Sequence, residues 1–303
     1  MSVNLKVNIA GVAWKNPVTT ASGTFGFGKE YAEYFDISRL GAVTVKSISV
    51  EKKLGNPTPR VAETASGMLN SVGLQNPGAE FFLKYELPNL KKLDTKIVVN
   101  IAGNTIDEYV AVTEMIGDSV DMLELNISCP NVKVGGMAFG VDEKSAFEAT
   151  SAVKKASKVP LIVKLSPNVT DISAIAAAVE NGGANAVSLI NTLLGMKIDI
   201  NKRKPILANN VGGLSGPAVM PIAVRMVYQV AQKVKIPIIG MGGISSGADA
   251  IEFLLAGASA VAVGTAGFVD PYAHIRVINE IEEYLKRNNI DDVNNIIGKL
   301  EMN

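Results

Sequence analysis

The chain has 303 residues, of which 48% are hydrophobic and 19% are charged. This composition allows a large buried core and excludes an intrinsically disordered protein. The 29 lysine and arginine residues equal the 29 aspartate and glutamate residues, which argues against nucleic acid as a partner, because domains that bind it carry excess positive charge. The single cysteine, Cys129, excludes an internal disulfide and any cysteine-based zinc or iron–sulfur site built by this chain alone.

The hydropathy pattern points to neither secretion nor membrane insertion. Residues 1–17 carry Lys6 and Lys15 and no long apolar core, unlike a secretory signal. The longest stretch without a charge, residues 253–269, is interrupted by glycines and is shorter than the roughly 20 apolar residues of a bilayer span. We therefore expect a cytoplasmic protein without a membrane anchor.

Short apolar runs rich in valine and isoleucine recur along the whole chain. They lie at residues 17–23, 42–49, 97–103, 122–129, 160–167, 186–192, 236–243 and 260–267. Continuous apolarity is typical of parallel strands that are buried on both faces. Stretches with helical spacing separate most of the runs, and Asp171 and Ser246 stand where helix N-caps are expected. The pattern predicts a TIM (β/α)₈ barrel, with residues 1–303 forming a single domain.

Two intervals between the predicted strands are much longer than the others. They contain residues 52–78, after the second strand, and residues 193–219, after the sixth. Both are rich in Gly, Pro and Asn and have little helical periodicity. Long insertions of this kind usually build a lid or a site instead of the core. The shorter loop at residues 130–140 is also Gly-rich and is expected to be able to move.

Polar residues close several of the predicted strands. They are Lys46, Asn100, Asn126, Cys129, Lys164 and Asn191. The active sites of barrel enzymes lie at the C-terminal ends of the strands, where a bound ligand can satisfy such groups. A single asparagine is more simply explained as a satisfied core or turn residue, but packing does not explain the whole set. The unperturbed pKa of a cysteine thiol is about 8.5, so a partly exposed cysteine near lysines can act as a proton acceptor.

Glycines end the last two strands, at Gly242, Gly243, Gly264 and Gly267. Loops after strands seven and eight bind phosphate in many barrels, because glycine leaves the backbone N–H groups open. A dinucleotide fingerprint is excluded, because Ser245 stands where GxGxxG requires glycine.

The sequence offers little evidence for a catalytic histidine or a metal site. The only histidine, His274, stands where an outer helix is expected to begin and is expected to be structural. No histidine–carboxylate cluster suggests a metal site. Two hypotheses stay open at this point: a Schiff-base aldolase with Lys164 as nucleophile, and a non-catalytic barrel that senses a nucleotide. The aldolase leaves Cys129 and the asparagines unexplained.

Eight short motifs then add a specific resemblance. They are NSVGLQNPG (70–78), VNIAG (99–103), NISCPNV (126–132), VKLSPN (163–168), INT (190–192), GLSGPA (213–218), GMGGI (240–244) and VGT (263–265). In this order the chain resembles the class 1 dihydroorotate dehydrogenases, and NSVGLQNPG with the cysteine is most similar to the class 1B catalytic subunit. The resemblance implies oxidation of (S)-dihydroorotate to orotate in de novo pyrimidine (UMP) biosynthesis, with one FMN per chain as hydride acceptor.

The resemblance also assigns roles to individual residues. Cys129 corresponds to the catalytic base. The FMN contacts implied are Ala21, Ser22, Lys46, Ser47, Asn100, Asn126, Lys164, Ile190, Gly216, Gly242, Gly243, Gly264 and Thr265. The substrate contacts implied are Lys46, Asn70, Ser71, Val72, Gly73, Leu74, Asn126, Asn131, Asn191 and Thr192.

The class 1B resemblance further implies a partner. Electrons would pass to NAD⁺ through an electron-transfer subunit that carries FAD and a [2Fe–2S] cluster, in a heterotetramer of two catalytic and two electron-transfer subunits. This chain cannot supply that relay, because it has one cysteine and no dinucleotide fingerprint. The alternative is a class 1A-like homodimer that reduces fumarate directly.

Overall fold

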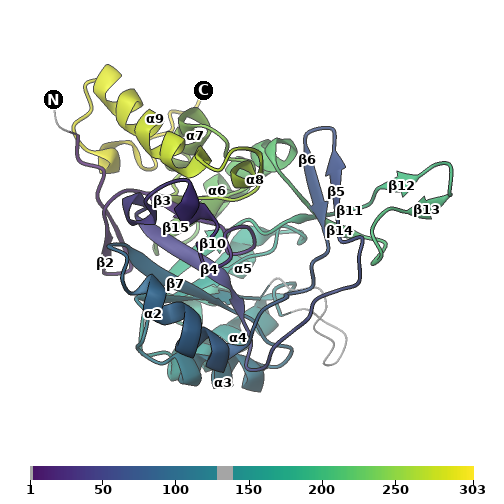
Figure 1. The fold of residues 1–303 in the computed structure, drawn as a ribbon. Helices are drawn as coiled ribbons and strands as arrows, with labels where there is room; N and C mark the ends of the chain where they lie inside the picture. Colours follow the sequence, from purple (N-terminus) through teal and green to yellow (C-terminus); the bar gives the residue numbers. More distant parts are fainter. Residues whose placement is uncertain (1–2, 128–138) are drawn as a thin grey trace.

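An eight-stranded parallel sheet forms the centre of the molecule (Figure 1). The structure is a computed structural model and describes residues 3–127 and 139–303. The strands, in spatial order, are β3 (Val18–Thr20), β16 (Ala260–Val263), β15 (Ile238–Met241), β10 (Ala186–Leu189), β9 (Leu161–Lys164), β8 (Met122–Asn126), β7 (Lys96–Ile101) and β4 (Ala42–Ile48). Each strand falls within or overlaps one of the eight apolar runs, so the predicted TIM barrel is confirmed.

Threonine side chains bridge the two edge strands and close the barrel. Thr20 Oγ1 donates to the Thr44 carbonyl at 2.8 Å and accepts from the Thr44 N–H at 2.9 Å. The hydroxyls of Thr19 and Thr44 lie 3.1 Å apart. All three threonines are buried, so these bonds between β3 and β4 satisfy groups that water cannot reach.

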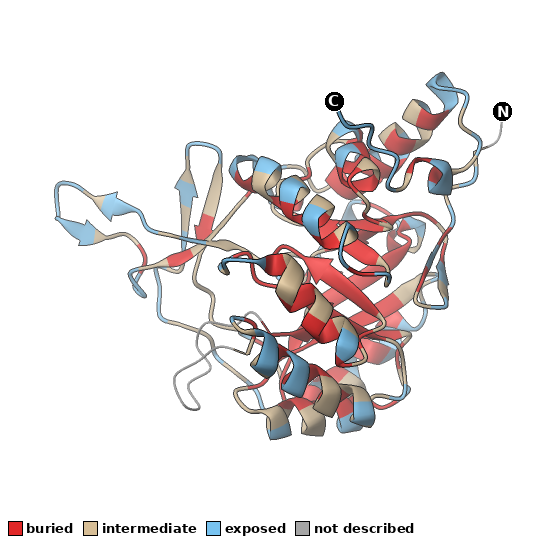
Figure 2. Cartoon of the chain, turned by 180° about the vertical axis from the view of Figure 1, so that it is seen from behind, coloured by how far each residue is buried: buried red, intermediate tan, exposed pale blue. Residues whose placement is uncertain are grey.

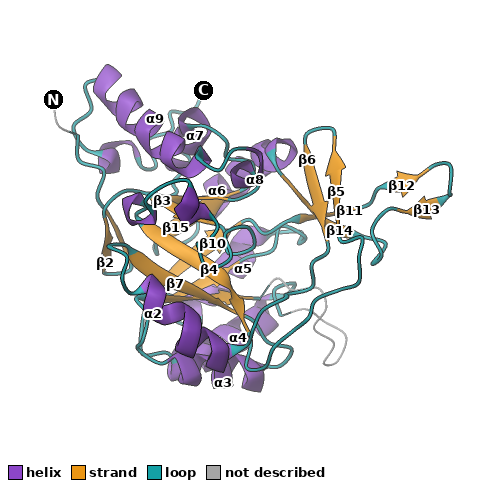
Figure 3. Ribbon diagram, viewed as in Figure 1, coloured by secondary structure: helices purple, strands orange, loops and turns teal. Residues whose placement is uncertain are grey.

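Helices cover the outside of the barrel, as Figure 3 shows. The longer ones are α3 (Ile106–Ile116), α4 (Glu143–Ala156), α5 (Ile172–Asn181), α6 (Met220–Ala231), α7 (Gly247–Leu255) and α9 (Ala273–Arg287). Shorter helical segments are α1 (Ala79–Phe81), a π-helical turn (Phe82–Glu86), α2 (Leu87–Leu90) and α8 (Ala266–Val269). Both predicted N-caps are confirmed: Asp171 accepts from the Ser173 N–H, and Ser246 accepts from the Asp249 N–H.

The two long insertions pair with each other at the edge of the barrel. They form a four-stranded antiparallel sheet, here called the rim sheet, in the order β11 (Leu193–Gly195), β14 (Gly212–Ser215), β6 (Gly67–Asn70) and β5 (Val61–Thr64). A hairpin of β12 (Ile198–Asp199) and β13 (Lys204–Pro205) extends from it, at the right of Figure 1. Two strand predictions extended too far, since β8 ends at Asn126 and β10 ends at Leu189, shortly before β11 of the rim sheet.

The core lies inside the barrel and between the barrel and its helices (Figure 2). Strands β8, β9, β10, β15 and β16 are buried at every position, which explains their mostly apolar sequences. A hairpin of β1 (Val7–Ile9) and β2 (Val12–Trp14) precedes β3 and buries Ile9 and Trp14. In the described ranges, no helix combines the length and apolarity needed to span a membrane.

Candidate active site

A cavity of about 590 Å³ opens at the carboxyl ends of the barrel strands. Barrel strands, the loops that follow them and the rim sheet all contribute to its wall. This volume lies within the range of about 300–1,000 Å³ that is typical of small-molecule sites.

Most of the residues expected at the site from the sequence line this one cavity. They are Ala21, Ser22, Lys46, Ser47, Asn70, Ser71, Val72, Gly73, Leu74, Asn126, Lys164, Ile190, Asn191, Thr192, Gly216, Gly242, Gly243, Gly264 and Thr265. Cys129 and Asn131 lie outside the described residues. On the described chain, Ile127 and Gly140 also line the cavity, so the segment that carries Cys129 is flanked on both sides by cavity residues.

Two lysines give the cavity its electrostatic character. Lys164, at the end of β9, is only 5% exposed, and its Nζ lies 3.5 Å from Ser22 Oγ. Burial, followed by the charges of Lys164 and Arg60, holds the pKa of Lys46 below its usual value. No aspartate or glutamate lines the cavity in residues 3–127 and 139–303. Two ammonium groups in a pocket without a carboxylate favour an anionic ligand.

The loops after β15 and β16 bring backbone close to the cavity. Gly242 and Gly243 have φ values of +130° and +84°. A Cβ on Gly243 would lie 2.7 Å from the Met220 Cβ, so this turn requires glycine. Thr265 follows β16, and its hydroxyl is 2.8 Å from Ser215 Oγ in the rim sheet. The two loops thus line the cavity with Gly242, Gly243, Gly264 and Thr265, whose small side chains leave the backbone accessible.

Asn100 is not among the residues that line the cavity. It faces Glu124 across the β7–β8 register, one layer deeper than Asn126. Asn100 Nδ2 donates to Glu124 Oε1 at 2.6 Å, and Ser188 Oγ donates to Glu124 Oε2 at 2.7 Å. Within the described part of the chain, the buried Oδ1 of Asn100 has no hydrogen-bond partner. This acceptor is free to take an N–H group from a ligand.

Comparison with known proteins identifies the family. The sequence model of the family described as dihydroorotate dehydrogenase matches residues 4–285. The chain belongs to the dihydroorotate dehydrogenase family. The resemblance predicted from the motifs, including its class 1B character, is therefore confirmed.

Individual relatives match along nearly the whole chain. The dihydroorotate dehydrogenase B (NAD(+)) catalytic subunit of Alkaliphilus oremlandii is 62% identical over 298 residues, which cover 98% of this chain and 99% of the relative. The protein of the same name from Thermoanaerobacter pseudethanolicus is 56% identical, with 99% and 100% covered. A crystal structure of DHODH from Eimeria tenella with ferulenol has a TM-score of 0.81 over 98% of this chain and 88% of that one. Its identity of 24% supports the fold alone.

Several residues in or beside the cavity were not predicted. Asn168 lines the cavity and holds the rim sheet, because its Oδ1 accepts from the Leu194 N–H at 2.9 Å. Its signal was present, since it ends the VKLSPN motif. Glu124 was missed as well, although a carboxylate inside the apolar run MLELN is unusual. Met68 and Phe268 also line the cavity, and nothing in their sequence surroundings indicates it.

Proposed function

We propose that this chain oxidises (S)-dihydroorotate to orotate in pyrimidine biosynthesis, as the catalytic subunit of an NAD⁺-linked enzyme. The observation that carries the proposal is the cavity at the strand ends, with two ammonium groups and no acidic side chain among its described lining residues. Orotate is a carboxylate and FMN is a phosphate ester, so both ligands are anions that this cavity suits. Relatives named for this reaction match the chain over almost its full length.

The residues present fit FMN as the cofactor. The glycine wall of Gly242, Gly243 and Gly264 lets a phosphate approach the backbone closely. Asn100 does not line the cavity itself, but its unpartnered Oδ1, one layer below Asn126, is an acceptor that a ligand N–H group could use. Bound FMN would supply the acceptor for the hydride that leaves C6 of the substrate.

The chain's own side chains would then bind and orient the substrate. The ammonium group of Lys46 suits the substrate carboxylate. Amide groups such as those of Asn70, Asn126 and Asn191 offer donors and acceptors that match the ring N–H and C=O groups. Held in this way, C5 of the dihydropyrimidine ring would face Cys129, whose Sγ takes the C5 proton as general base.

Lys164 is proposed to provide electrostatic stabilisation. Its buried ammonium group lies in the same cavity, and no carboxylate of the described chain lies within ion-pair distance of it. An uncompensated positive charge in a site of low dielectric favours negative charge that develops in the transition state. This role also explains why a lysine stands at the end of a buried strand, where its desolvation is costly.

The route of the electrons requires a partner in this proposal. The matching relatives are named catalytic subunits of an NAD(+) enzyme, which supports a partner subunit. In the proposal this partner carries FAD and a [2Fe–2S] cluster, in a heterotetramer with two copies of each chain. The same proposal places residues 1–303 in one FMN-binding domain and the enzyme in the cytoplasm. A class 1A-like homodimer that uses fumarate is the competing hypothesis for the acceptor.

Anaerobic reduction of the bound flavin is the direct test. The purified protein should be yellow, and dihydroorotate should bleach the flavin absorbance. Cys129→Ser should retain FMN and orotate yet reduce the flavin about 10²-fold or more slowly. A protein that cannot be reconstituted with FMN, or trapping of a carbonyl substrate on Lys164 by borohydride, would overturn the proposal. Assay with the co-purified partner, with NAD⁺ against fumarate, decides the acceptor.

A further inference from the structure

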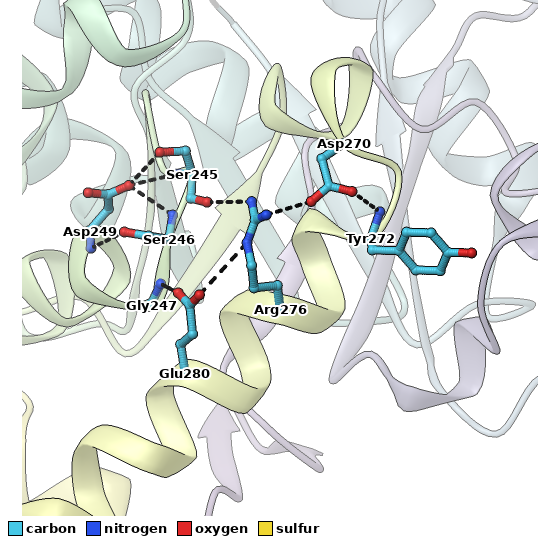
Figure 4. A network of polar contacts seen from close by, with 8 residues as sticks. All are labelled: Ser245, Ser246, Gly247, Asp249, Asp270, Tyr272, Arg276 and Glu280. Atoms are coloured by element: carbon cyan, nitrogen blue, oxygen red, sulfur yellow. Dashed lines mark hydrogen bonds and ion pairs between the residues drawn. The ribbon is translucent and has the colours of Figure 1, made fainter.

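One arginine outside the cavity connects the loop after β15 to the segment that follows α8. Arg276 lies in the first turn of α9, and its side chain is 44% exposed. Figure 4 shows it between the loop that follows β15 and the segment that follows α8. Nη2 donates to the Ser245 carbonyl at 3.0 Å, and Nη1 lies 2.6 Å from Asp270 Oδ2.

Both contacts lie close to the cavity-lining glycines. Ser245 comes two residues after Gly243, and Asp270 directly follows α8, which begins after Thr265. One planar guanidinium group therefore ties the backbone of the loop after β15 to Asp270, which is joined to the loop after β16 through the short helix α8. Its fork geometry allows both bonds at once, which a single ammonium group does not match.

Further bonds hold each end of this connection in place. Asp249 Oδ2 accepts from the Ser245 N–H, the Ser245 hydroxyl and the Ser246 N–H, at 2.8–2.9 Å. Asp270 Oδ1 accepts from the Tyr272 N–H at 2.9 Å. The loop after β15 is thus fixed through its N–H groups by Asp249 and through its carbonyl by Arg276.

Helix α9 makes a second contact with the same region through Glu280. Its Oε2 accepts from the Gly247 N–H at the start of α7, and its Oε1 lies 3.8 Å from Arg276 Nε. A Cβ on Gly247 would lie 2.3 Å from the Glu280 Cβ, so glycine permits this close approach. The middle of α9 is therefore coupled to the first turn of α7, the helix that follows the loop after β15.

We propose that Arg276 is a positioning residue that sets the separation of the two phosphate-binding loops and thereby the affinity for the phosphate end of FMN. The inference rests on the proposed function, in that it takes FMN as the ligand of the cavity. Arg276 is expected to contribute little to the free energy of unfolding, because an ion pair with partly exposed side chains is weak. The relevant effect is preorganisation: without Arg276, the two loops must be ordered by the ligand, which lowers affinity.

The test compares two flavins on the full-length apoprotein. Arg276→Gln should weaken FMN binding about tenfold, which corresponds to roughly 1.4 kcal/mol, while the affinity for riboflavin, which lacks the phosphate, stays within twofold of the wild type. Arg276→Lys should recover part of the FMN affinity. Asp270→Asn should weaken FMN binding in the same direction, because it removes the other end of the connection.

A matched control lies on the same helix. Glu282 pairs with Lys286 on α9, away from both loops, so Glu282→Gln should bind both flavins as the wild type does. Unchanged FMN affinity in Arg276→Gln, or an equal loss for FMN and riboflavin, would overturn the positioning role. A wild-type protein that binds no FMN would instead overturn the proposed function on which this role rests.

Discussion

The buried histidine of α9 gives the chain a pH-dependent stability that can be measured directly. His274 is fully buried, with its ring 5.4 Å from that of Phe25 and 5.6 Å from that of Tyr31. Burial lowers the pKa of His274 from 6.5 to about 4. His274 also packs closely against α8, because a Cβ on Gly267 would lie 2.9 Å from His274 Cε1.

The sign and the size of the effect follow from these two pKa values. Because the folded state binds the proton less readily than the unfolded state, His274 favours folding above pH 6.5 and loses that contribution as the pH falls towards 4. Each pH unit in this window costs about 1.36 kcal/mol. Between neutral pH and pH 5 we expect a loss of roughly 2 kcal/mol from this residue alone.

The assay compares wild type with His274→Gln in denaturant unfolding at pH 7.5 and pH 5. The variant can be less stable at both pH values, but its stability should fall by about 2 kcal/mol less between them. Carboxylates also titrate in this range, and their contribution cancels in the comparison. Identical pH dependence in the two proteins, or a His274 pKa near 6.5 in an NMR titration, would refute the reasoning.

Three further predictions concern the cavity. Lys164→Met should slow flavin reduction by about 10²-fold in stopped-flow experiments, because it removes the buried charge that stabilises the transition state. Gly243→Ala should sharply weaken FMN binding in fluorescence titrations, because the new Cβ would lie 2.7 Å from the Met220 Cβ. Gly11→Ala should not weaken it, because Gly11 also has positive φ but has open space around it. Orotate affinity should fall at alkaline pH, because carboxylate binding needs the charged form of Lys46. The fall should begin below pH 10.5, since the pKa of Lys46 is lowered from that value. Lys46→Met should bind orotate weakly and without this pH dependence.

Each of these predictions has a contrary outcome. Wild-type reduction rates in Lys164→Met would remove that residue from the chemistry. Equal FMN affinity in Gly243→Ala and Gly11→Ala would show that the glycine wall does not contact the phosphate. Orotate affinity that stays constant up to pH 10.5 would place its carboxylate away from Lys46.

The barrel and the ring of polar groups at its mouth were predictable from local patterns. A strand buried on both faces needs a continuous apolar run, so eight such runs with helical stretches between them indicated the TIM barrel. The parallel arrangement then brings all the carboxyl ends to one side. For this reason the sequence alone was enough to place Lys46, Asn126 and Lys164, each at or near the end of a run, in one site.

Other features depend on which distant segments meet, and local patterns do not contain that information. The rim sheet pairs Asn70 with Gly213, from two insertions whose sequences show no regular periodicity. The bond from Asn100 to Glu124 and the connection made by Arg276 arise in the same way. Hydrophobic periodicity specifies the face that a segment buries, whereas hydrogen-bond partners depend on register and packing between elements far apart in the chain. Only the tertiary structure therefore shows that two ammonium groups line the cavity and that no carboxylate is among its described lining residues.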